Sequence, residues 1–316
     1  MSIWQQIANR ELGYLSSIGE ALHNLHSTKN DAFNSVECGE IIFCSDYSGQ
    51  HKTAKYETYS FVITTDLFLR KWLPLLGDFR QKYLPDGRRL SFKKLNEPMR
   101  KRSLEPFLKV ASLLEGNLVS VMIDKRLGSI CPGGTEGVKE VFDDCFPPII
   151  KDSSVEKMFR LASLSTLLIA GFRTERQTSF WVSDHDEALD TNEKREGLAR
   201  LSAYLAFGLT GWQNPADQYF TTTGLSTAPL WSEDLATIAD FAAGAYCEMS
   251  SMLPTLMGTP KWLVGMSSTS IKDWRAQKIG NWLATNTNSL KHVLIRMEDD
   301  GNAGFRTSAQ IFQSLR

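Results

Sequence analysis

The first helix that the sequence predicts is amphipathic. Residues 2–26 have a helical pattern because Leu15, Ile18, Leu22 and Leu25 recur at three- and four-residue steps and form one apolar stripe. The stripe predicts packing either on the chain's own domain or on a partner, as a homo-oligomer or with another protein. We treat residues 1–30 as this helix, and residues 31–316 as one elaborated domain.

The rest of the chain alternates strand-like and helix-like segments, which is an α/β pattern. No internal repeat or low-complexity linker divides it. A stretch rich in Gly and Pro, residues 128–135, is predicted to be a loop. The predicted strands cover residues 40–46, 58–65, 88–95, 118–123, 178–183, 218–223 and 291–297, and the predicted helices cover residues 66–83, 98–115, 155–172, 192–208, 232–248 and 271–284.

Three acids stand where an unpaired charge is costly. Asp46 ends a predicted strand just before Ser-Gly, Asp184 follows a later strand with Asp186 two residues on, and Asp240 lies among small apolar residues of a helix. Acids at buried strand ends and on apolar helices need a compensating partner. A divalent metal is a common one, and two-metal sites cleave phosphodiesters.

Each acid also has an interpretation without a metal. Asp46 fits an Asx turn that holds its own loop. Asp184 and Asp186 point the same way in an extended chain and repel unless a cation lies between them. They also fit a solvated loop before a helix that Asp190 caps. Asp240 has the strongest case for function, because its small neighbours let the helix approach a sheet closely.

A basic segment lies between these acids in the sequence. Residues 86–109 hold eight basic and three acidic residues, Lys93 and Lys94 among them. Such a surface attracts and positions a phosphate backbone, although many charge runs are only solvated faces. Phe92, between the basic residues, either stacks on a base or belongs to the core.

Composition narrows the class of protein. The chain has 316 residues, 42% hydrophobic and 22% charged, and a formal net charge of −1, which excludes a globally basic nucleic-acid binder. Its five cysteines show no zinc spacing, and its N-terminus lacks a signal-peptide pattern. The longest apolar stretch is too short to span a bilayer. We therefore expect a soluble cytoplasmic protein without a membrane anchor. The P-loop, GxGxxG, HExxH and GxSxG motifs do not occur.

The order of these segments resembles the DUF3800 family, a group named only as a domain of unknown function. Residues 46–49, Asp-Tyr-Ser-Gly, resemble its Asp-Glu-Ser-Gly opening, and residues 91–95 resemble a Lys-bearing segment. Asp184 follows the later strand where that family carries an acid, and residues 238–244 resemble its Ala-Asp-x-x-Ala-Gly helix. The resemblance covers roughly residues 39–250, and Tyr47 departs from it by replacing a carboxylate.

The resemblance implies a ribonuclease-H-like mixed sheet flanked by helices, here with helical insertions and the N-terminal helix. We therefore predict a metal-dependent nuclease in which Asp46, Asp184 and Asp240, with Asp186 in support, hold Mg²⁺ or Mn²⁺. Lys93 or Lys94 is predicted to stabilise the scissile phosphate. Two alternatives stay open. One is a non-catalytic binding or adaptor protein on the same fold, which Tyr47 favours, and the weaker one is a phosphohydrolase acting on a small nucleotide.

Overall fold

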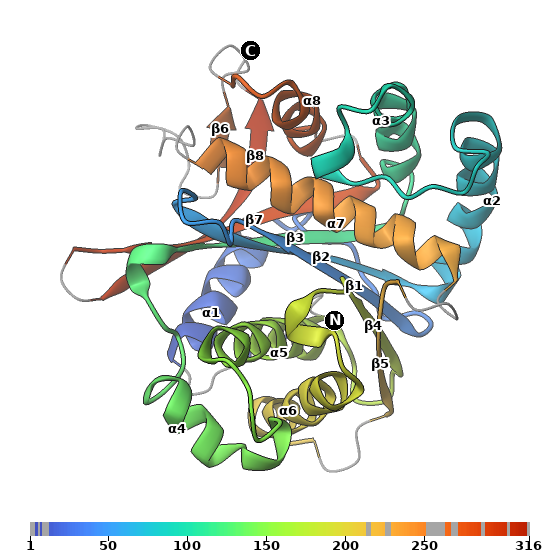
Figure 1. Cartoon of the computed structure of the whole chain (residues 1–316). Helices are drawn as coiled ribbons and strands as arrows, with labels where there is room; N and C mark the ends of the chain where they lie inside the picture. Colours follow the sequence, from blue (N-terminus) through green and yellow to red (C-terminus); the bar gives the residue numbers. More distant parts are fainter. Residues whose placement is uncertain are drawn as a thin grey trace.

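The computed structural model describes residues 4, 5, 7, 13–212, 216–224, 229–250, 263–266, 271–285, 288–301 and 304–314. A central sheet separates two layers of helices (Figure 1). Within the described residues this sheet has eight strands, in the order β5-β4-β1-β2-β3-β7-β8-β6. The strands are β1 Ile41–Ser48, β2 Tyr56–Thr65, β3 Gly116–Asp124, β4 Ser179–Ser183, β5 Gln218–Thr222, β6 Leu263–Met266, β7 Leu290–Asp299 and β8 Phe305–Ser314.

Strand directions identify the fold. β2 runs antiparallel to both β1 and β3, whereas β4 is parallel to β1 and β5 is parallel to β4. The sheet continues through β7, which is parallel to β3. The order β5-β4-β1-β2-β3 with only β2 reversed is the ribonuclease-H-like arrangement. The expected mixed sheet flanked by helices is therefore confirmed.

The helices divide between the two faces of the sheet. Helices α1, α4, α5 and α6 contribute to one hydrophobic core, and helices α2, α3, α7 and α8 contribute to the other. The bounds are α1 Gly13–Thr28, α2 Asp66–Tyr83, α3 Pro98–Ala111, α4 Gly134–Val141, α5 Asp152–Phe172, α6 Asn192–Thr210, α7 Leu230–Met249 and α8 Trp274–Leu283. Short 3₁₀ helices lie between them in the described part of the chain: η1 Phe92–Lys94, η2 Lys125–Leu127, η3 Asp143–Cys145 and η4 Glu187–Leu189.

Strand β1 shows how the sequence builds both cores. Ile41 and Phe43 face the layer of α1 and α5, whereas Ile42 and Cys44 face the layer of α2 and α7. Successive residues of a strand point to opposite faces, so a continuous apolar run fits a strand that is covered on both sides. By the same alternation, Asp46 faces the layer of α7.

The apolar stripe of the N-terminal helix packs against the chain's own core. Leu15, Ile18, Leu22 and Leu25 are buried, and α1 packs on β8 and α5. The stripe therefore supports the prediction of packing on the chain's own domain and leaves the predicted partner surface without support. The part of this predicted helix before Gly13 lies largely outside the described residues.

Three sequence predictions differ from the structure. Residues 88–95 are not a strand, because they form a loop and the short helix η1. The predicted loop over residues 128–135 leads into α4, which begins at Gly134 after Gly133 in the left-handed region. Strands β6 and β8 were not predicted. β8 lies between β7 and β6, and its first residues are exposed or half-buried, which weakens their apolar pattern.

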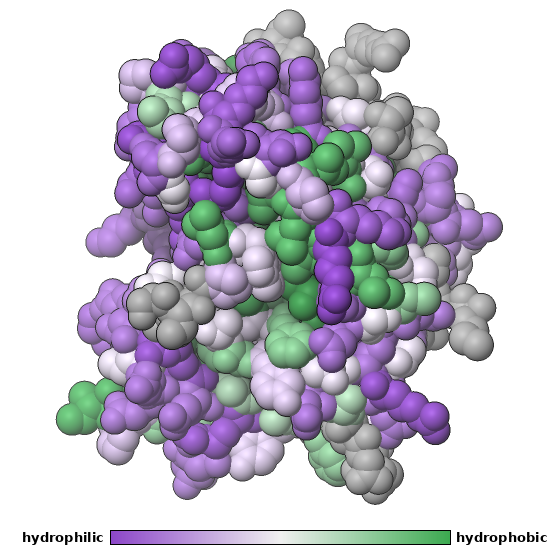
Figure 2. Space-filling view, turned by 90° about the vertical axis from the view of Figure 1, so that its right-hand side faces the viewer, coloured by the Kyte–Doolittle hydropathy of each residue, from purple (hydrophilic) through white to green (hydrophobic). Residues whose placement is uncertain are grey.

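The sheet ends at strand β5 on one side. Figure 2 shows that side of the molecule, where hydrophobic residues gather across the middle between hydrophilic parts above and below. Tyr219 of β5 is half-exposed and stacks on Phe180 of β4, with ring centroids 5.0 Å apart. Among the described helices, none is long and apolar enough to cross a membrane.

Candidate functional site

Two of the predicted acids meet because β1 and β4 are parallel and in register. Ser45 of β1 lies opposite Ser183 of β4, so Asp46 and Asp184 come next on neighbouring strands. The amide N–H of Asp184 donates to the carbonyl oxygen of Ser45 at 2.9 Å, which continues the pairing one residue past β4. Both acids therefore lie at the same edge of the sheet, where the carboxyl ends of parallel strands meet.

The third acid reaches this edge from helix α7, which crosses β1 and β2. The carboxylate of Asp240 accepts a hydrogen bond from the amide N–H of Phe92 at 2.6 Å. Small residues allow this approach: a Cβ on Gly244 would lie 2.5 Å from the Phe92 ring. Asp240 is thus aimed at the loop before η1, and Phe92 belongs to the core and does not offer a stacking surface.

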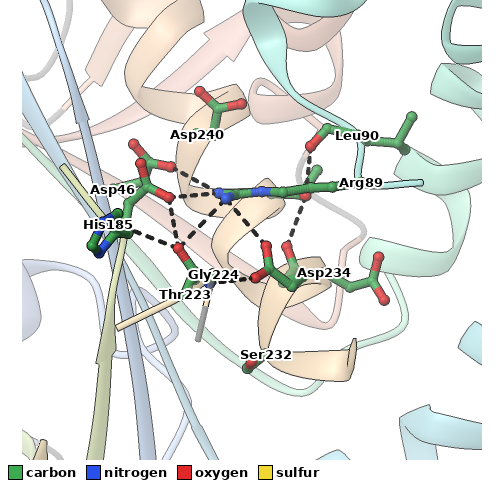
Figure 3. A network of polar contacts seen from close by, with 12 residues as sticks. Asp46, Arg89, Leu90, His185, Thr223, Gly224, Ser232, Asp234 and Asp240 are labelled. Carbon is green, nitrogen blue, oxygen red and sulfur yellow. Dashed lines mark hydrogen bonds and ion pairs between the residues drawn. The ribbon is translucent and has the colours of Figure 1, made fainter. Parts of the chain in front are cut away.

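Arg89 lies between these acids (Figure 3). Its guanidinium is 2.8 Å from a carboxylate oxygen of Asp184 and 3.5 Å from one of Asp46. On its other side it is 3.1 Å from Glu233, in the first turn of α7. Asp240 lies within range of the same charge. Three carboxylates therefore contact one guanidinium and a fourth lies nearby, so acidic groups outnumber the basic one in this cluster.

The pKa values of these acids are raised mainly by burial, and repulsion between the acids adds to the effect. Burial raises the pKa of Asp46 well above its usual value, the charges of Asp184 and Asp240 raise it further, and Arg89 offsets this only in part. Burial also raises the pKa of Asp240 to about 6, against the opposing effects of the Phe92 amide and Arg89. Like charges in a buried site disfavour full ionisation. An added cation would relieve this cost.

Asp184 and Asp186 do not face a common cation. Asp184 also accepts from the hydroxyl of Thr223 at 2.9 Å. Asp186 instead caps η4 by accepting from the amide of Ala188 at 2.8 Å, and its other oxygen pairs with Lys157. The two acids part because β4 ends at Ser183, so the alternation of an extended strand no longer applies at Asp186.

Lys157 is a residue near the site that sequence reasoning missed. Its ammonium lies 3.9 Å from the centre of the Tyr47 ring, and its side chain is only 12% exposed. Burial lowers the pKa of Lys157 to about 8, although Glu57, Asp46 and Asp184 oppose the shift. The sequence does not single it out, because the first half of α5 also carries Asp152, Glu156 and Arg160.

Lys93 and Lys94 are exposed on η1, directly after the loop that carries Arg89. The charge of Lys93 lies close enough to Lys157 to lower its pKa further. Part of the basic segment is neutralised locally, because Arg88 and Arg100 pair with Glu97. Farther along, the ammonium of Lys101 lies 4.8 Å from the Trp274 ring.

The donor atoms around Arg89 suit a hard divalent cation. Carboxylate oxygens are the ligands that Mg²⁺ and Mn²⁺ prefer, and the cluster is short of positive charge. However, no three His, Cys, Asp or Glu side chains in the described part of the chain converge closely enough to hold a metal ion. The chemistry of the residues therefore fits such a cation, and their present spacing fits the larger guanidinium.

No protein-family model and no curated protein matches the chain. Among solved structures, it is similar to the ribonuclease H2 from Pyrococcus horikoshii OT3, with 11% sequence identity and a TM-score of 0.35. The match covers 77% of this chain and 85% of that chain. A likeness this loose carries no argument about the site, and membership of DUF3800 stays a prediction.

Proposed function

We propose that this chain is a nuclease-like protein that holds Mg²⁺ or Mn²⁺ with Asp46, Asp184 and Asp240 and acts on phosphodiester bonds of nucleic acid. One observation supports this most: the three predicted acids, from two strand ends and one helix, gather in a cluster with excess negative charge. Buried carboxylates that repel one another gain most from a divalent cation.

Each residue near the cluster has a separate role in this proposal. Asp46 and Asp184 are fixed by the paired strand ends, and Asp240 is fixed by the Phe92 amide. When bound, the cation supplies Lewis acidity toward a phosphate oxygen and a more acidic water. Lys93 and Lys94, exposed beside the cluster, attract and position the phosphate backbone. Asp186 is left out of the ligand set because it pairs with Lys157.

Cleavage assays with single- and double-stranded DNA and RNA, in Mg²⁺ and in Mn²⁺, test this proposal. Asp46→Asn is expected to lower the metal-dependent rate by at least about a hundredfold, since even residues that only support a metal ligand are worth about 10–100-fold. Asp78→Asn, the same change at an exposed position of α2, is expected to leave the rate unchanged. Equal rates in Asp46→Asn and wild type contradict the proposal.

The second candidate is a non-catalytic binding protein on the same fold. It is favoured by Arg89, which already neutralises part of the acid cluster, and by Tyr47, which stands where a second acid is expected. Under this alternative the cluster is a structural ion-pair centre. Nucleic acid then binds without turnover, and Asp46→Asn changes stability but not affinity.

A further inference from the structure

Arg89 makes ion pairs with three different acids, which is more than a surface arginine usually makes. One terminal nitrogen contacts Asp184 and Asp46, and the other contacts Glu233 at 3.1 Å. The first two acids belong to the proposed ligand set, whereas Glu233 does not. The guanidinium is therefore held through both terminal nitrogens, and only one of them contacts acids that would bind a metal.

The backbone that carries Arg89 is also fixed. Its carbonyl oxygen accepts from Arg100 at 2.9 Å, and the next carbonyl, that of Leu90, accepts from Thr237 of α7 at 3.0 Å. The loop cannot shift freely, so the position of the guanidinium depends on its side-chain contacts. Glu233 itself is fixed on its other oxygen, which accepts from the Gly224 amide at 2.8 Å.

Arg89 and a divalent cation need the same carboxylate oxygens. Unit charges a few ångströms apart in a partly buried site repel strongly, so the two cations exclude each other. Building on the function proposed above, we infer that Arg89 is a resident counter-cation that competes with the metal. Glu233 is the positioning residue that holds Arg89 in the cluster. Metal entry then requires the guanidinium to leave Asp184 and Asp46.

Glu233→Gln tests this inference because two explanations of the cluster predict opposite changes in the affinity for Mn²⁺. If the cluster only attracts cations by its net charge, removing an acid weakens Mn²⁺ binding. If Glu233 holds a competitor in place, removing its charge frees Arg89 and tightens Mn²⁺ binding. The tightening is expected to be on the order of tenfold, the effect of one hydrogen bond to a charged group. A glutamine oxygen still accepts from the Gly224 amide, so the local backbone keeps its partner.

The measurement is a calorimetric titration with Mn²⁺, supported by the Mn²⁺-induced shift in melting temperature. Glu298→Gln is the matched control, since Glu298 also pairs with arginines, Arg296 and Arg306, but on β7 and β8, outside the cluster. The Mn²⁺ affinity of this control is expected to equal that of wild type. Arg89→Lys is a second test: it keeps the charge but loses the two-sided contact, and it is expected to bind Mn²⁺ more tightly than wild type.

The outcomes separate this inference from the proposed function. Tighter binding in Glu233→Gln and Arg89→Lys, with Glu298→Gln unchanged, supports the competition. Weaker or equal binding in Glu233→Gln overturns it, while the metal site itself stands. If wild type and every variant fail to bind Mn²⁺, the proposed function fails, and the inference that rests on it falls as well.

Discussion

The buried ion pair between helices α2 and α7 gives a sharp prediction about stability. Arg80 and Asp234 make two hydrogen bonds of 2.7 Å, from Nε and from one terminal nitrogen to the two carboxylate oxygens. The side chains are 10% and 0% exposed. Replacing one partner leaves the other buried without a counter-charge, which costs about 3–5 kcal/mol. We expect Asp234→Asn to lower the free energy of unfolding by that amount.

The attraction within this pair does not exceed the cost of burying it. Burial raises the pKa of Asp234 to about 6 even though Arg80 donates to it. Desolvation therefore outweighs the pairing for this carboxylate. It follows that the double replacement Arg80→Met with Asp234→Leu is expected to be far less destabilising than either single change, because it removes both charges together.

Urea denaturation of the two single variants and the double variant measures the coupling directly as a double-mutant cycle. A cost below about 1 kcal/mol for Asp234→Asn refutes the reasoning, since a contact that weak is typical of an exposed ion pair. The position of Asp234 beside Glu233 links this pair to the site. The same variant is therefore expected to loosen the loop that carries Arg89.

Two further predictions concern the core on the α7 face of the sheet. Burial lowers the pKa of His292 to about 4 from its ordinary 6.5, so the folded state keeps it neutral. Stability is expected to fall by up to about 3 kcal/mol between pH 6.5 and 4; urea denaturation across this range should show that loss in wild type and not in His292→Gln. Gly244→Ala drives a Cβ into the Phe92 ring and is expected to cost about 1–3 kcal/mol. Gly77→Ala, where nothing lies within 4 Å, should instead stabilise α2 by about 0.5–1 kcal/mol, and equal thermal shifts in these two variants contradict the packing argument.

Much of the fold could be predicted because its signals are local. Strand β1 opens with the apolar run Ile41–Cys44, strand β2 contains the apolar run Phe61–Ile63, and α5 is buried on almost every side. Residues 88–95 misled the prediction because their contacts are long-range. Arg89 is satisfied by Glu233, and the Phe92 amide is satisfied by Asp240, so this segment is bound to helix α7 and not to the sheet.

The candidate site was predictable only where strand geometry decides it. Asp46 and Asp184 each follow an apolar run, and parallel pairing brings such positions together. Asp240 could be singled out by its small neighbours. The central place of Arg89 could not be predicted, since nothing in residues 86–109 distinguishes it from Arg88 until the loop meets α7. The position of Lys157 near the site also follows only from the packing of α5 over Tyr47.

A Mn²⁺ titration by calorimetry tests the central claim most directly. It compares wild type with the Asp46→Asn, Asp240→Asn double variant, each with and without a single-stranded oligonucleotide, since phosphate oxygens can complete a Mg²⁺ or Mn²⁺ site. We predict binding in wild type that the double variant loses. Equal binding in both proteins, or no binding in wild type even with the oligonucleotide present, contradicts the account.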